Sequence, residues 1–174
     1  MEDQERFVDQ VVRVVDMASI KSVLDLGPKS INIAKEFEPK ENLKFKVGYS
    51  HQAHGRFDLV ILNMVLQWIP RHLLIPTLNQ IDQCGATFVF IKDFRPQKFL
   101  SSVSVHNPNV RIFKQDYRQM FTTFPFFQVG WEEVEYATRG IDFIRSSFLI
   151  KRVSLDEAYE DRPSVVENQR GKKS

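Results

Sequence analysis

The sequence predicts an α/β fold, in which a doubly wound and mostly parallel sheet carries helices on both faces. Two observations support this prediction. Short, continuously apolar segments recur along the chain, as expected of strands that are buried on both faces of a parallel sheet. Segments with the apolar spacing of amphipathic helices alternate with them. The chain has 174 residues with a hydrophobic fraction of 43%, which fits one domain with a core of its own.

The first half of the chain predicts two helices and three strands. Residues 5–18 place apolar side chains at helical spacing. Ser22–Gly27 is a short apolar strand that ends in a turn, and Ser30 is a good N-cap for a helix through Phe37. Leu43–Gly48 alternates as a second strand, and Phe57–Leu62 is nearly all apolar. One helix and one strand therefore separate Gly27 from Phe57, which leads us to expect a sheet of six strands.

The second half continues the alternation and then changes to paired strands. Helical spacing covers Leu73–Gln83, and Thr87–Ile91 is a continuously apolar strand. Lys114–Phe124 has the pattern of a further helix. Phe127–Tyr136 and Asp142–Arg152 read as an antiparallel pair. The strands predicted at Val23–Leu26, Phe57–Leu62 and Thr87–Ile91 are continuously apolar, so we expect them to be neighbours at the centre of the sheet.

Three regions are predicted along the chain. Residues 1–19 form an N-terminal helix that packs on the domain, and residues 20–152 form the α/β domain itself. Residues 153–174 are polar with mixed charge, and we expect them to pack little because they offer few apolar groups to offset the entropy of ordering.

Composition excludes several classes of function. The net charge of +2 does not favour a nucleic-acid partner or an anionic membrane. No apolar run reaches the length of a membrane span, and the acidic start of the chain is unlike a secretory signal, so the cytoplasm is the expected location. Cys84 is the single cysteine, which excludes an intrachain disulfide, and the four histidines lack metal-site spacing, so no metal is predicted.

Three segments, in this order, resemble motifs of class I S-adenosylmethionine-dependent methyltransferases. Val23–Gly27 resembles the first motif, an apolar strand followed by an acid, an apolar residue and glycine. Phe57–Asn63, with Val65–Pro70 after it, resembles the fourth strand of the family and the helix that follows. Gly85–Phe94 resembles its fifth strand. The resemblance extends over residues 20–150 and implies a Rossmann-like sheet, S-adenosylmethionine as cofactor, and methyl transfer to a small molecule such as a sugar.

The resemblance also implies positions for the site, because ligands of such sheets bind beyond the carboxyl ends of the strands. The implied cofactor-binding residues are Asp25, Gly27, Lys29, Tyr49, Ser50 and Asn63. The implied substrate-side residues are Gln67, Asp93 and Arg95. The sequence offers no general base that can be assigned, but methyl transfer often needs only proximity and alignment, so this lack does not exclude it.

The chain departs from the family pattern in three ways. Lys29 and Ile31 stand where two further glycines are usual, and no Asp or Glu occurs between Leu43 and Arg56 to accept hydrogen bonds from a ribose. The 30 residues from Gly27 to Phe57 suffice for one strand–helix–strand unit, so the fold is shortened by one strand–helix unit. These departures predict weak binding of S-adenosylmethionine.

Two functions therefore stay open. The chain is an active methyltransferase with an atypical cofactor pocket, or it is a non-catalytic methyltransferase-like scaffold or partner subunit with a degenerate site. A small-molecule substrate or a protein partner follows accordingly, and the chain could form homo- or hetero-oligomers. Structural roles also compete at single residues: Asp25 could cap the turn or pair with Lys21 or Lys29. Asp93 and Arg95 could form a local ion pair, and Trp68 is expected in the core.

Overall fold

The computed structural model describes residues 2–27, 44–48, 54–104, 107–123, 127–136 and 144–153. The helix predicted over Ser30–Phe37 and the polar tail after Val153 lie outside these residues. So do the candidate site residues Lys29, Tyr49 and Ser50.

The main sheet has six strands in the described part of the chain, as predicted. Four parallel strands occupy one side, in the order β2-β1-β3-β4, and two antiparallel strands complete the other side as β8 and β7. The strands are β1 (Ser22–Leu26), β2 (Lys44–Gly48), β3 (Leu59–Asn63), β4 (Phe88–Phe94), β7 (Phe127–Glu135) and β8 (Arg145–Arg152). The predicted central neighbours β1, β3 and β4 are adjacent, and the predicted antiparallel pair is formed.

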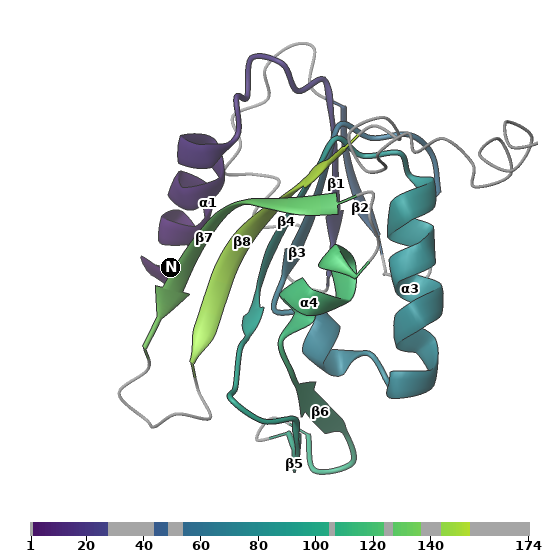
Figure 1. Ribbon diagram of the computed structural model, residues 1–174, viewed down its shortest axis with the longest axis vertical. Helices are drawn as coiled ribbons and strands as arrows, with labels where there is room; N and C mark the ends of the chain where they lie inside the picture. The colour runs from purple at the N-terminus through teal and green to yellow at the C-terminus, as the bar shows by residue number, and fades with distance from the viewer. Residues whose placement is uncertain are drawn as a thin grey trace, which may run out of the picture.

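Helices cover both faces of this sheet, as Figure 1 shows. One face carries α1 (Glu2–Val14), and the other carries α3 (Arg71–Gln83) and the short α4 (Tyr117–Thr122). Each face has a separate hydrophobic core because side chains alternate across a strand. Residues 59 and 61 of β3 point toward α1, and residues 60 and 62 point toward α3.

The core under α1 is aromatic. Phe90 of β4 is fully buried and meets Phe7 of α1 edge to face, with ring centroids 5.3 Å apart. Phe90 also stacks on Trp131 of β7, with ring centroids 5.9 Å apart. Burying a side chain of this size stabilises the fold by roughly 1.5–3 kcal/mol. Phe90 therefore joins the N-terminal helix to both halves of the sheet.

Two expectations about local structure were wrong. Within the described part of the segment predicted as a helix over Lys114–Phe124, the helix runs from Tyr117 to Thr122, and Lys114 belongs to strand β6 (Arg111–Lys114). Strand β6 pairs with β5 (Leu100–Val103) in a small separate sheet that the sequence did not predict. Trp68, expected in the core, is 36% exposed.

The strand order reverses beside β1. The chain passes from β1 to β2 on one side and then returns across β1 to β3 on the other side. In open α/β sheets, such a reversal leaves a crevice beyond the carboxyl ends of the two strands, where ligands bind. We call the carboxyl ends of β1 and β3 the switch point.

Candidate functional site

Gly27 and Asn63 both lie at the switch point. Asp25 of β1 pairs in register with Ile61 of β3, so Gly27, directly after β1, and Asn63, the last residue of β3, lie at the same end of the sheet. Gly27 has φ 156°, and Gly48 follows the register on the other side of β1, beside Leu26. Without Cβ atoms at these glycines, the edge of the sheet fits a ligand that approaches the backbone closely.

Met64 carries backbone strain at the same place. Its φ is 57°, in the left-handed region that residues other than glycine seldom occupy. Two hydrogen bonds hold it there: its N–H donates to the Lys92 carbonyl (2.7 Å), and its carbonyl accepts from the Gln67 side-chain amide (3.2 Å). Strain of this kind clusters at functional sites. Sequence reasoning missed Met64, because nothing in the residue type signals the conformation.

Gln67 and Asp93 fix the short 3-10 helix that follows Met64. Gln67 lies in the 3-10 helix η2 (Leu66–Trp68) and is 3% exposed, and Asp93 of β4 is fully buried. The Gln67 backbone N–H donates to the Asp93 carboxylate at 3.3 Å, and the Phe94 N–H donates to its other oxygen at 2.8 Å. Both residues therefore brace η2 from within in this structure, and the local ion pair between Asp93 and Arg95 is not formed among the described contacts.

Burial dominates the electrostatics of Asp93. The removal of its carboxyl from water raises the pKa of Asp93 to about 7, although N–H groups of Phe94, Gln67 and Leu66 work in the opposite direction. The Asp93 carboxylate also interacts electrostatically with Tyr117 of α4. The burial of Tyr117, and secondly Asp93, raise the pKa of Tyr117 above its ordinary value.

Asp25 lies inside the sheet rather than at its edge. It is 1% exposed within β1, two residues before Gly27. The backbone N–H of Lys21 donates to the Asp58 carboxylate at 2.9 Å, and Ser22 contributes two further hydrogen bonds to the same oxygen. Asp58 therefore ties the start of β1 to the start of β3.

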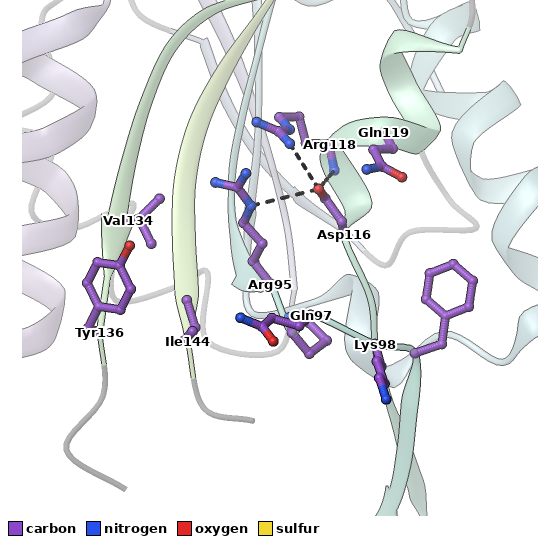
Figure 2. A pocket seen from close by; sticks show the side chains of 11 residues that line it. Arg95, Gln97, Lys98, Asp116, Arg118, Gln119, Val134, Tyr136 and Ile144 are labelled. Carbon is purple, nitrogen blue, oxygen red and sulfur yellow. Dashed lines mark hydrogen bonds and ion pairs between the residues drawn. The ribbon is translucent and has the colours of Figure 1, made fainter. Parts of the chain in front are cut away.

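A cavity of about 720 Å³ opens beside Arg95, at the end of the sheet where β4 finishes (Figure 2). The Arg95 N–H donates to the Ile144 carbonyl at 2.8 Å, which extends the pairing of β4 with β8 by one step. We call this cavity the Arg95 pocket. Its lining comprises Arg95, Pro96, Gln97, Lys98, Phe99, Asp116, Arg118, Gln119, Val134, Tyr136 and Ile144.

Four charged side chains form a network at the pocket. Glu132 of β7 accepts from Arg95 at 2.6 Å and from Arg118 at 2.7 Å. Asp116 lies 3.0 Å from Arg118 and 3.7 Å from Arg95. Of these four residues, the sequence singled out Arg95 alone. Asp116 offered a readable signal, since it caps α4 by accepting from the Arg118 N–H, whereas Glu132 is brought in only by the tertiary fold.

Other kinds of site find no support in the described residues. No group of three or more His, Cys, Asp and Glu side chains among them could hold a metal ion. No helix in the described part of the chain is long and apolar enough to cross a membrane.

Comparison with solved structures identifies the architecture. No protein-family model matches the sequence, and no curated protein matches it either. A Burkholderia thailandensis 1,6-didemethyltoxoflavin-N1-methyltransferase, solved with S-adenosylhomocysteine, is similar with a TM-score of 0.63 at 11% identity, over 87% of this chain and 79% of that one. A Leishmania major SAM-dependent methyltransferase gives 0.62 at 14% identity, over 86% and 72%.

A third similar structure is the magnesium protoporphyrin IX methyltransferase of Synechocystis with bound S-adenosylhomocysteine, with a TM-score of 0.57 at 10% identity, over 87% of this chain and 83% of that one. At such low identity the likeness establishes the fold and nothing further. The chain has the fold of class I S-adenosylmethionine-dependent methyltransferases.

Proposed function

We propose that this chain binds S-adenosylmethionine at the switch point and transfers its methyl group to a small molecule. The observation that carries the proposal is the position of the Arg95 pocket relative to the switch point. Lys92 of β4 pairs in register with Asn63, and Arg95 follows three residues later. At about 3.3 Å per strand residue, Arg95 is roughly 10 Å beyond that pair, at the same end of the sheet. Two ligands could therefore meet there.

The residues of the switch point would hold the cofactor. Gly27 would allow its amino-acid end to approach the backbone, and Asn63 offers a carboxamide for hydrogen bonding. Asp25 would support the turn from inside β1, and Lys29, Tyr49 and Ser50 would supply the remaining contacts. The cofactor itself supplies an electrophilic methyl group on a sulfonium centre.

The remaining residues would position the acceptor. Gln67 and Asp93 hold η2 and the strained turn at Met64 in place, which would keep the backbone after Asn63 fixed beside the proposed site. Arg95 would orient the acceptor from the pocket. Proximity and alignment of this kind can account for much of the rate of a methyl transfer. The Asp93 carboxyl is fully buried and occupied by backbone N–H groups, so we assign it no role as a general base.

The alternative is a non-catalytic scaffold or partner subunit that keeps the fold. Two sequence features favour it: the absence of any acid between Leu43 and Arg56 where a ribose would need one, and Lys29 in the turn after Gly27. A lost charge-assisted hydrogen bond is worth roughly 1.5–3 kcal/mol, which weakens affinity by about ten- to a hundredfold. We therefore expect weak cofactor binding rather than none.

Calorimetric titration with S-adenosylmethionine and S-adenosylhomocysteine tests the proposal. We expect both ligands to bind the wild-type protein with affinity weaker than low micromolar. Gly27→Ala places a methyl group where the ligand would approach and should weaken binding further. Gly130→Ala on β7 is the matched control, because its new Cβ would meet only the Leu149 carbonyl oxygen at an ordinary 3.9 Å. No heat with millimolar ligand would refute cofactor binding and favour the scaffold.

A further inference from the structure

The Arg95 pocket has a positive surplus of charge. Three cations line it: Arg95, Lys98 and Arg118. One carboxylate, Asp116, lines it as well, and the second carboxylate, Glu132, pairs with the two arginines. One positive charge therefore exceeds the negative charges of this group. A net positive charge at a cavity attracts ligands of negative charge.

The carboxylates of Glu132 and Asp116 fix the orientation of Arg95 and Arg118 but do not use all of their N–H donors. Each guanidinium has five N–H donors. Arg118 uses one terminal nitrogen on Glu132 and the other on Asp116, and Arg95 uses Nη1 on Glu132 with Nε at 3.7 Å from Asp116. Donors on both side chains are left for a ligand. Because ion pairs already fix the guanidinium groups, less side-chain entropy is lost when the ligand binds.

Lys98 adds a cation of a different kind. It is exposed on the lining, and it forms no ion pair within the described part of the chain. Figure 2 shows it across the pocket from Val134 and Tyr136. An ammonium group on a flexible stem acts as a mobile point charge, which suits an oxyanion whose position varies.

The same pocket offers apolar surface. Phe99 and Tyr136 are 81% and 79% exposed, unusually high values for aromatic side chains. Val134 and Ile144 are only partly buried on the β7–β8 side. The volume of about 720 Å³ is within the range of small-molecule sites. A ligand with a flat apolar body would cover surface that the folded chain leaves exposed.

We propose that the Arg95 pocket binds a small aromatic oxyanion, whose carboxylate or phosphate group lies beside Arg95 and Arg118, within reach of the flexible Lys98 side chain, and whose ring contacts Tyr136. Its role as the methyl acceptor rests on the proposed function, whereas the binding itself does not. The pocket therefore selects acceptors by charge and by a flat apolar body.

Titration followed by amide chemical shifts tests this inference on the full chain. The probes are benzoate, phenyl phosphate and the uncharged benzamide, each at millimolar concentration. We expect shifts at pocket residues with the two anions, and at least tenfold weaker binding of benzamide, since it lacks the charge. Binding of the anions should weaken as salt is raised. The stronger of the two anions identifies the oxyanion.

Lys98→Gln removes the free cation without breaking an ion pair of the described network. It should weaken benzoate or phenyl phosphate binding by about three- to tenfold, the modest effect expected of an exposed charge. Lys151→Gln is the matched control: Lys151 is also exposed, but it pairs with Phe88 at the opposite end of β4. It should leave binding unchanged.

Three results would overturn the inference: equal binding of benzamide and benzoate, equal affinity of wild-type and Lys98→Gln protein, or shifts confined to residues outside the pocket. Titration of the same samples with S-adenosylhomocysteine separates the two proposals. Anion binding without cofactor binding would retain the pocket and refute methyl transfer. Cofactor binding without anion binding would refute the inference about the pocket and leave methyl transfer as the proposed function.

Discussion

Replacing Asp93 with asparagine should remove a pH dependence of stability that the buried carboxyl imposes. In the folded protein, burial raises the pKa of Asp93 to about 7, whereas the unfolded chain has the ordinary value of 3.8. Between these values the folded state holds a proton that the unfolded state has released. The free energy of unfolding therefore falls as pH rises from about 4 to 7, and it is constant with respect to this group above that range.

The magnitude follows from the two pKa values. Their difference is roughly 3 pH units, which at about 1.36 kcal/mol per unit corresponds to about 4 kcal/mol in total. Between pH 5 and pH 8 only the upper part of this range is crossed, so about 3 kcal/mol is expected there. The asparagine side chain of the variant keeps an acceptor for the η2 backbone but cannot ionise. Any cost of its amide group is independent of pH.

Urea denaturation at pH 5 and pH 8, followed by circular dichroism, measures the effect. The stability of Asp93→Asn relative to wild type should improve by about 3 kcal/mol from pH 5 to pH 8. Asp9→Asn on the exposed side of α1 is the control and should follow the wild-type profile. Parallel profiles for wild type and Asp93→Asn would show that the carboxyl stays ionised in the folded protein and would refute the reasoning.

Three other substitutions test other parts of the fold. Glu135→Gln removes the carboxylate that lies 2.9 Å from the Lys92 ammonium, and the Lys92 side chain is 4% exposed. The substitution should lower the free energy of unfolding by about 2–3 kcal/mol in urea titrations. A loss below about 0.5 kcal/mol would argue against a buried ion pair. Phe90→Ala should cost about 3–5 kcal/mol, whereas Phe99→Ala, at an 81% exposed position, should change little; similar losses would contradict the assigned core. Burial alone would raise the pKa of Asp58, but hydrogen bonds from the start of β1 outweigh it and lower that pKa, so the stabilisation by the ionised carboxylate is present at neutral pH and lost as pH falls through the folded pKa. Asp58→Asn should therefore lower the free energy of unfolding by up to about 1 kcal/mol at pH 7 and by nothing near pH 2. An equal loss at both pH values would exclude the ionised form as the cause.

Much of the sheet could be predicted because its central strands satisfy a simple physical condition. Segments such as Val60–Leu62 are buried on both faces, so an unbroken apolar run identifies them without knowledge of their neighbours. The hairpin of β5 and β6 satisfies no such condition. Ser101 and Ser102 are exposed, and the burial pattern along β5 does not alternate, so the segment lacks the period of a strand.

The site was harder to predict, because the roles of its residues depend on tertiary contacts. Gln67 and Trp68 are neighbours, and hydrophobicity alone would bury the tryptophan. The structure instead buries the glutamine, whose amide and backbone N–H both find partners, and leaves the tryptophan 36% exposed. The network of Glu132 with Arg95 likewise joins residues from two distant strands, which no local pattern reveals.

The position of β8 in the sheet constrains how the chain can fold during its synthesis. This strand is the last of the main sheet in the sequence, yet it lies between β4 and β7, and its Ser147 donates to Gln10 of the N-terminal helix. Until residue 152 has left the ribosome, β4 has an open edge and β7 has no partner in the sheet. The apolar face of α1, with Phe7 and Val11, can pack on β1, β3 and β4 before then, but it contacts Leu149 of β8 only after that strand has formed. Such long-range closure slows folding and leaves unpaired strand edges exposed in the nascent chain, where they favour aggregation.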